Sequence, residues 1–173
     1  MIISVAELRQ FITTEETDPV LEAKLQALEI LIRKHTHNNF QVRAIRSQSA
    51  VLDNKILNPP EHLKTGDTIQ ISDSLLNNGI YTVKEISDGM AVSGELLDCA
   101  KNLITKVEYP PDVVMGAVNM LKWDLQNRDK IGVQSETISR HSVTYFSMDG
   151  SNSAIGYPKA LTGFLTPYMK ARF

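Results

Sequence analysis

The sequence predicts an α+β fold: a small α-helical bundle with an inserted small β-barrel of the SH3-like sort, followed by a C-terminal hairpin and arm. Apolar residues recur at three- and four-residue spacing before residue 41 and again after residue 110, which is typical of helices. Between these positions short alternating runs are separated by turn-forming residues, which is typical of strands. We therefore assign residues 1–41 and 110–173 to a helical domain and residues 42–109 to an inserted all-β domain.

Two helices are expected in the first segment. A capping-box pattern at Ser4 predicts a short helix that runs to about Ile12. Asp18 as N-cap and Pro19 at the first helical position predict the start of a second, longer helix. We expect that helix to stop near residues 38–39, two asparagines that tolerate a left-handed cap. Its apolar stripe consists of Leu21, Leu25, Leu28 and Ile32.

The insert is expected to form a compact barrel because its strands are short and its turn signals are frequent. Asn-Gly and Asp-Gly pairs, at residues 78–79 and 88–89, mark two of the turns. The expected strands are residues 68–72, 80–86, 90–92 and 103–107.

The C-terminal segment begins with a helix and then changes pattern. Asp112 can cap a helix that runs to about Asn127. Residues 137–146 are rich in β-formers, and we expect an exposed strand or hairpin there, with a turn at 149–153. A last short helix fits residues 159–165, before a tail that is both basic and aromatic.

Composition and charge disfavour two classes of partner. The chain carries 18 basic and 20 acidic residues, a net charge of −2, and residues 42–109 alone carry seven basic and nine acidic ones. A protein that binds the phosphate backbone is expected to concentrate Lys and Arg. No run approaches the roughly 18 apolar residues that a membrane span needs, and the N-terminus has no signal-peptide pattern. We expect a chain that folds in the cytoplasm and binds no membrane.

The sequence offers no catalytic or metal-binding motif. His35 and His37 are two residues apart near a helix end, a spacing that turns them to different faces. The single cysteine, Cys99, has no second cysteine with which to pair, and we interpret it as a small buried apolar residue. Phosphate-binding loops and nucleophile-elbow patterns are missing. We therefore predict no enzyme activity, no cofactor and no metal.

Two stretches resemble a known family of phage proteins. The first is the N-terminal layout of a capped short helix, a Thr/Glu/Asp loop and a long helix that ends in residues 36–40 (THNNF). The second comprises residues 132–145 (GVQSETISRHSVTY), 156–159 (GYPK) and 165–173 (LTPYMKARF). Together they are similar to the head–tail connector proteins, also called adaptor or head-completion proteins, of long-tailed bacteriophages that infect Gram-positive hosts.

The resemblance implies a structural role in the virion, at the head–tail interface. A ring of about twelve copies would sit beneath the portal protein. It would extend the channel through which packaged DNA passes and would present a surface to the next connector or tail-completion protein. The resemblance further implies a protruding hairpin at about 133–156 and a C-terminal arm at about 166–173 that reaches toward the portal. Residues 66–72 and 78–84 resemble an insertion of some family members, which we expect on the outer rim of the ring.

Two segments supply candidate interaction residues. The β-prone segment is rich in hydroxyl groups, which suits backbone pairing with a neighbouring chain, or equally an edge strand within the same chain. Its candidates are Thr137, Ser139, Arg140, Ser142 and Thr144. In the tail, Tyr168 and Phe173 are expected to anchor in a partner's pocket while Lys170 and Arg172 pair with acidic groups. The alternative is that the apolar residues of this tail close the core of their own chain.

Two other functions stay open on the sequence alone. A nucleic-acid-binding module that uses the SH3-like insert is the first, and a salt-dependent mobility shift would detect it. An enzyme with a dispersed site, such as a small hydrolase, is the second. A metal or paired carboxylates in a pocket would be its structural sign.

Overall fold

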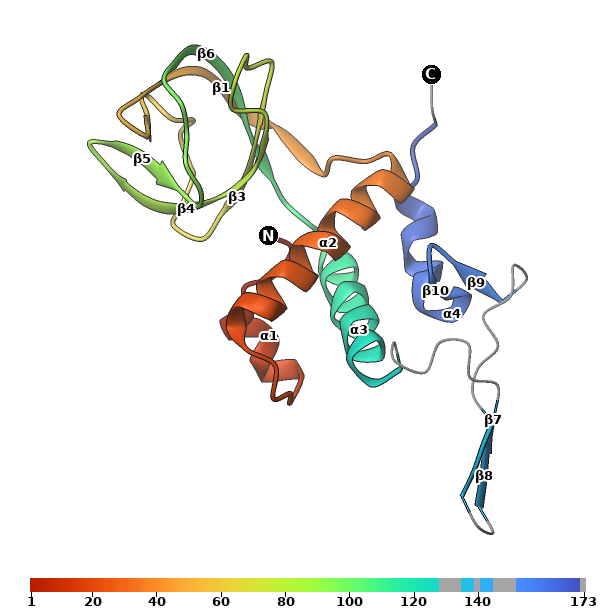
Figure 1. Ribbon diagram of the computed structural model, residues 1–173. Coiled ribbons are helices and arrows are strands. Elements are labelled where there is room, and N and C mark those ends of the chain that lie inside the picture. Colours follow the sequence, from red (N-terminus) through yellow and green to blue (C-terminus); the bar gives the residue numbers. More distant parts are fainter. Residues whose placement is uncertain (128–134, 139–140, 145–151, 172–173) are drawn as a thin grey trace. The chain divides into compact units, whose positions relative to one another are not determined.

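The α+β class is confirmed. The structure, a computed structural model, describes residues 1–127 and 152–171 together with the backbone of 135–138 and 141–144. Within these residues it contains four α-helices, a closed six-stranded antiparallel barrel and a small C-terminal hairpin (Figure 1).

The chain divides into two compact units. The first, here called the barrel unit, comprises Met1–Ser4 and Asn38–Tyr109. The second, here called the helical unit, comprises Val5–His37 and Pro110–Phe173. The first four residues belong to the barrel unit because the Met1 nitrogen donates a hydrogen bond of 2.6 Å to Thr68 Oγ1.

The barrel closes through its last strand. The strand order is β1-β2-β5-β4-β3-β6, and β6 pairs antiparallel with both β3 and β1. Closure leaves no free sheet edge in the barrel. Its strands are β1 (Gln41–Leu52), β2 (Lys55–Ile56), β3 (Thr68–Ser72), β4 (Gly79–Ser87), β5 (Gly89–Val92) and β6 (Cys99–Val107).

Apolar side chains from all six strands fill the barrel. Each such side chain, when fully buried, contributes about 1.5–3 kcal/mol. Gly89 has a φ of +103°, which lets the Asp-Gly pair turn tightly between β4 and β5. The buried core consists of Val51, Ile56, Ile69, Ile71, Val83, Met90, Val92, Leu96 and Ile104.

The four predicted strands are present, but two further strands were not predicted. The strand β1 is the longest of the barrel, yet its first half carries Arg43 and Arg46 and lacks an apolar alternation. Its pairing with β6 also shifts register between Val42 and Arg46, which interrupts the two-residue period. The two-residue strand β2 is too short to leave a pattern.

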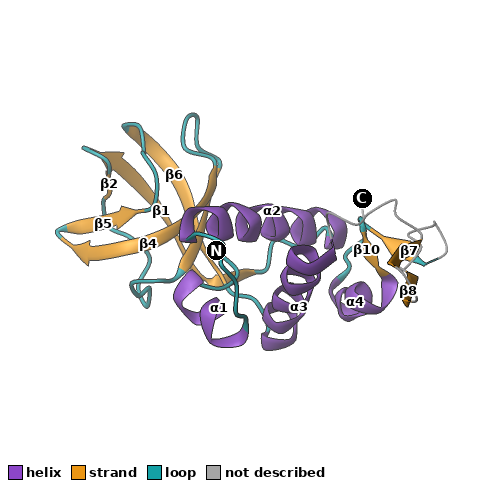
Figure 2. Cartoon of the chain, turned by 60° about the horizontal axis from the view of Figure 1, so that its bottom comes forward, coloured by secondary structure: helices purple, strands orange, loops and turns teal. Residues whose placement is uncertain are grey.

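Helices pack together in the second unit (Figure 2). The predicted stripe of α2 is buried along its whole length, and α3 buries Val113, Ala117 and Leu121 on one face. The elements are α1 (Val5–Phe11), α2 (Asp18–Thr36), α3 (Pro111–Asn127), β9 (Ser153–Ala154), β10 (Tyr157–Pro158), α4 (Lys159–Thr162) and a 3₁₀ helix, η2 (Gly163–Tyr168).

The predicted caps of α2 were each wrong by one or two residues. Thr17 is the N-cap, and Asp18 lies in the first turn, where its carboxylate binds Arg9 instead of capping. At the other end, the left-handed residue is His37, with a φ of 50°, one residue before the predicted asparagines.

The last predicted helix is divided. The α-helical part ends at Thr162, and the chain continues as 3₁₀ helix through Pro167, which has no N–H to donate to an α-helical ladder. Residues 149–151 of the predicted turn lie outside the described residues.

Candidate interaction surfaces

The hairpin is a two-stranded sheet of its own. Strand β7 (Ser135–Ile138) pairs antiparallel with β8 (His141–Thr144), and Thr137 lies opposite Ser142. In the part of the chain that the structure describes, neither strand joins the barrel or the β9–β10 sheet. Three of the five predicted hairpin candidates lie on these strands: Thr137, Ser142 and Thr144. The other two, Ser139 and Arg140, lie outside the described residues.

An isolated two-stranded hairpin is at best marginally stable in water. Each of its strands has one edge that the other strand does not use, and such an edge is a template for pairing with another chain. The pairing of this hairpin with a neighbouring chain stays a prediction; the structure shows that its two strands pair with each other.

The C-terminal segment packs on its own helical unit. Leu165 is fully buried, and the ring of Phe164 lies over Gly116, where an added Cβ would come within 2.2 Å of it. The backbone nitrogen of Lys170 donates a hydrogen bond of 2.8 Å to the Thr36 carbonyl at the end of α2. Up to Lys170, the segment therefore packs as the alternative expectation has it, against the core of its own chain.

Tyr168, a predicted anchor for a partner, bonds within its own chain. Its hydroxyl lies 2.8 Å from each carboxylate oxygen of Asp112, in the first turn of α3. The hydrogen bond to this carboxylate raises the pKa of Tyr168 above its ordinary value. The side chain is still half-exposed, and the remaining tail candidates, Arg172 and Phe173, lie outside the described residues.

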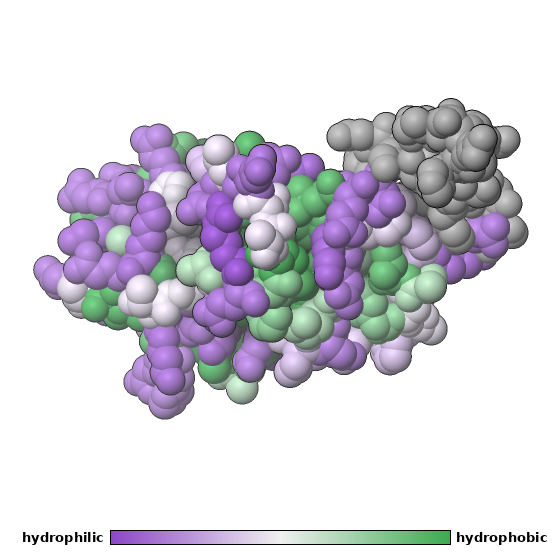
Figure 3. All heavy atoms as spheres, turned by 90° about the horizontal axis from the view of Figure 1, so that it is seen from below, coloured by the Kyte–Doolittle hydropathy of each residue, from purple (hydrophilic) through white to green (hydrophobic). Residues whose placement is uncertain are grey.

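A pocket of about 400 Å³ opens in the helical unit between the α1–α2 turn and the second half of α3. Residues 11–14 form one wall, and Lys122, Leu125 and Gln126 form the other. Phe11 is 50% exposed, so much of an aromatic side chain faces solvent here. Figure 3 shows apolar surface gathered between hydrophilic side chains on the face that is seen from below. We call the hollow that residues 11–14, Lys122, Leu125 and Gln126 line the helix pocket.

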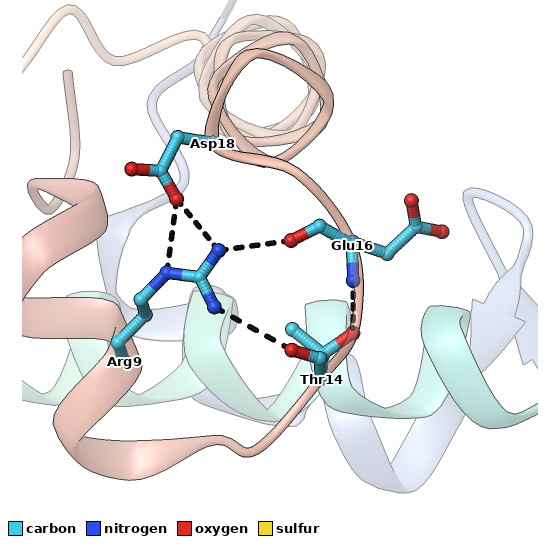
Figure 4. A network of polar contacts seen from close by, with 4 residues as sticks. All are labelled: Arg9, Thr14, Glu16 and Asp18. Atoms are coloured by element: carbon cyan, nitrogen blue, oxygen red, sulfur yellow. Dashed lines mark hydrogen bonds and ion pairs between the residues drawn. The ribbon is translucent and has the colours of Figure 1, made fainter.

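Arg9 fixes the turn that forms one wall of the helix pocket (Figure 4). Its guanidinium donates two hydrogen bonds to Asp18 Oδ1, at 2.9 and 2.6 Å, and one of 2.8 Å to the Glu16 carbonyl. A longer contact of 3.5 Å reaches the Thr14 carbonyl. An arginine fork that binds several acceptors at once restricts a loop more than a single bond does. The Thr/Glu/Asp loop is therefore an ordered turn.

A second apolar surface lies on the barrel unit, in the loop of residues 73–78 between β3 and β4. Two adjacent leucines of this loop are exposed, Leu75 to 86% and Leu76 to 52%. Leu97, which is 53% exposed, lies close by because Asn77 bonds to its backbone nitrogen and oxygen. We call residues 73–78 the leucine loop.

Buried polar groups hold the leucine loop in place. Asn102 on β6 is fully buried, and its Oδ1 accepts hydrogen bonds from Ser74 Oγ, at 2.7 Å, and from Asn77 Nδ2, at 3.2 Å. Its Nδ2 donates to the Ser49 and Cys99 carbonyls at 3.1 and 2.9 Å. A fully satisfied buried network specifies one arrangement of the chain. The leucines are therefore exposed on a fixed loop.

Cys99, at the start of β6, is not a buried apolar residue as predicted. It is partly exposed, and its sulfur lies 3.7 Å from the hydroxyl of Ser74 in the leucine loop. The prediction was wrong because none of the first three residues of β6 is buried; the strand contributes to the barrel core further along, at Ile104.

Neither of these two surfaces was predicted from the sequence. The leucine pair within a run of Asp, Ser and Asn was a visible signal, since apolar pairs are uncommon in polar loops. The helix pocket left none, because residues 11–14 and 122–126 meet only after folding. In the described ranges, no three His, Cys, Asp or Glu side chains are grouped so as to hold a metal ion.

No α-helix in the described residues is long and apolar enough to span a membrane. A scan against models of protein families found no match, and a search of curated proteins found none either.

Proposed function

We propose that this chain is a structural subunit of a phage head–tail connector. It forms a ring of about twelve copies at the portal vertex and joins the DNA-filled head to the tail. Portal protein lies on one side of the ring and the next connector or tail-completion protein on the other. The chain acts by binding its neighbours and catalyses no reaction.

The observation that carries this proposal is the separate hairpin. Strands β7 and β8 pair with each other and with no other described strand. A two-stranded sheet of four residues a side gains little by itself, so a neighbour that adds backbone hydrogen bonds is the natural source of its stability. In a ring, each copy supplies such a neighbour to the next.

Deletion of the gene from its phage genome tests the proposal. We expect lysates that contain DNA-packaged or leaking heads beside separate, complete tails in electron micrographs, with infectivity restored by the gene in trans. Normal infectious particles without the gene would overturn the proposal.

The hairpin is tested in the same assay with two substitutions at one position. Thr137→Pro removes a backbone donor from β7, and we expect it to fail to restore infectivity. The control Thr137→Ala keeps the backbone donor and is expected to restore it. Equal complementation by both variants would show that the hairpin does not carry the function.

A further inference from the structure

Three exposed leucines lie together at one end of the barrel. Asn77 donates a hydrogen bond of 2.8 Å to the Leu97 carbonyl and accepts one of 2.9 Å from the Leu97 nitrogen, so Leu97 lies beside the leucine loop. The loop is tied to the buried Asn102, and a surface that is already ordered loses little conformational freedom when it binds. We call the side chains of Leu75, Leu76 and Leu97 the leucine surface.

Acidic side chains surround the leucine surface. Glu95 and Asp98 flank Leu97 in the sequence, and Asp73 begins the leucine loop. The Asp98 carboxylate accepts a hydrogen bond of 2.9 Å from the backbone nitrogen of Asp53, which places a fourth acid here. The lysines that are closest along the chain to these acids are only two, Lys55 and Lys101. We call the four exposed acids the acidic rim: Asp53, Asp73, Glu95 and Asp98.

The tail of the chain carries the opposite charge, interleaved with apolar side chains. Residues 152–173 include three basic residues and no acidic one, and residues 169–173 read MKARF. Met169 is 49% exposed, and methionine adapts its shape to irregular apolar surfaces. Lysine and arginine have long side chains that reach a charged group while their stems lie along apolar surface. This segment therefore complements an apolar surface with an acidic rim.

The tail is too short to reach the leucine surface of its own chain in any arrangement of the two units. The Lys170 nitrogen bonds to the Thr36 carbonyl, and Glu108, just beyond the end of β6, bonds to the Phe40 carbonyl. The leucine surface lies at the start of β6, beside Cys99, and the nine residues of this strand span about 27 Å. The four residues from Thr36 to Phe40 and the three beyond Lys170 together extend by at most about 25 Å. A second copy is therefore the source of a tail for this surface.

We propose that residues 169–173 of one copy dock on the leucine surface of a second copy. Met169 and Phe173 pack against the leucines, and Lys170 and Arg172 pair with the acidic rim. The inference rests on the proposed ring and names one contact within it. Because the tail and the leucine surface are different surfaces, the contact is heterologous, and repetition of a heterologous contact generates a closed ring when the rotation permits.

The single cysteine of the chain makes the contact measurable by disulfide crosslinking. Cys99 is partly exposed, and its sulfur lies 3.7 Å from the Ser74 hydroxyl in the leucine loop. The tail variant is A171C/C99S, and the matched control is A160C/C99S, which places its thiol at an exposed alanine of α4. Each full-length variant is mixed with the unmodified chain and oxidised glutathione. Peptide mass spectrometry then measures the disulfide between Cys99 and the introduced cysteine.

We expect at least about tenfold more of this disulfide with the tail variant than with the control, because docking raises the local concentration of the two thiols. L75S/L76S in the unmodified partner, or K170E/R172E in the tail variant, should each lower the yield by about tenfold or more. I30S in the partner, which removes an apolar side chain of 47% exposure from α2, should leave the yield unchanged. Circular dichroism should show the same secondary structure in all variants, since the substituted side chains of the described residues are not buried.

Three results would overturn the inference. The first is an equal yield from the tail variant and its control, and the second is a yield that L75S/L76S and K170E/R172E leave unchanged. The third is a disulfide within one chain when A171C is introduced with Cys99 retained, because the tail would then reach its own barrel. The gene-deletion experiment is decided independently, so failure of this contact and failure of the connector role are distinguishable.

Discussion

The substitution Gly116→Ala, which adds one methyl group to α3, tests how the C-terminal segment is held against that helix. A Cβ added there would lie 2.2 Å from Cζ of Phe164 and 2.3 Å from its Cε1. Carbon atoms pack best at about 3.5–4.0 Å, so the ring would have to withdraw by more than about 1 Å. The half-buried ring can do so only by giving up its contact with α3.

Two opposing contributions determine how much Gly116→Ala changes the free energy of unfolding. Forcing an extra carbon into a filled site costs about 1–3 kcal/mol, whereas alanine in a helix interior is better than glycine by about 1 kcal/mol. We expect a net loss of about 0–2 kcal/mol in the free energy of unfolding. In a Phe164→Ala background the steric term is gone, and the same change should stabilise by about 1 kcal/mol. The effect therefore changes sign.

Urea unfolding followed by tryptophan fluorescence measures this cycle. Trp123 is the only tryptophan of the chain, and its ring centroid lies 5.6 Å from that of Tyr157, so it reports on the helical unit. A Gly116→Ala variant that is more stable than the parent chain would refute the reasoning. Equal shifts in both backgrounds would do the same, because Gly116 and Phe164 would then not be coupled.

Three further predictions concern hydrogen bonds and a cap. Asn102→Ala should destabilise the barrel unit by about 2–4 kcal/mol, because it leaves several buried groups unpaired. The control Gln48→Ala, at an exposed position, should change the free energy of unfolding by less than about 0.5 kcal/mol. Urea unfolding followed by circular dichroism compares the two variants. Asp112→Asn should lower the pKa of Tyr168, which phenolate absorbance measures. Because the pKa of Tyr168 is raised in the folded state, its hydrogen bond to Asp112 stabilises the fold below the ordinary tyrosine pKa. That contribution disappears as the pH rises through the raised value. His37→Gly should raise the melting temperature slightly, since glycine adopts the left-handed φ of 50° without strain, and a lower melting temperature would show that the His37 side chain matters more than its backbone.

The elements that could be predicted from the sequence are those that a strong period determines. The stripe of α2 and the alternation of β3 each require burial on one side only, so periodicity located them. The strand β1 escaped because its first half pairs through polar residues and a register shift. Its pairing with β6 joins residues 48 to 66 positions apart, and no local pattern carries that information.

The same distinction between local and long-range patterns applies to the candidate surfaces. The hairpin was predictable because β-formers and hydroxyl residues are contiguous in the sequence, and its pairing is local. Tyr168 was predicted to face a partner, but its hydrogen bond with Asp112 joins residues that are 56 positions apart. The helix pocket needs two such segments to meet. Sequence patterns therefore reveal surfaces made by one segment and miss those made by two.

The exposure of the leucine loop follows from a balance of free energies. Folding Leu75 and Leu76 inward would gain about 1.5–3 kcal/mol for each leucine fully buried. It would also detach Ser74 and Asn77 from Asn102, and each buried polar group left unpaired costs about 1–3 kcal/mol. The backbone groups at Leu97 would lose their partners on Asn77 as well. Four unpaired groups cost about 4–12 kcal/mol, whereas two buried leucines gain about 3–6 kcal/mol. The balance therefore favours the outward arrangement, in which both leucines face solvent.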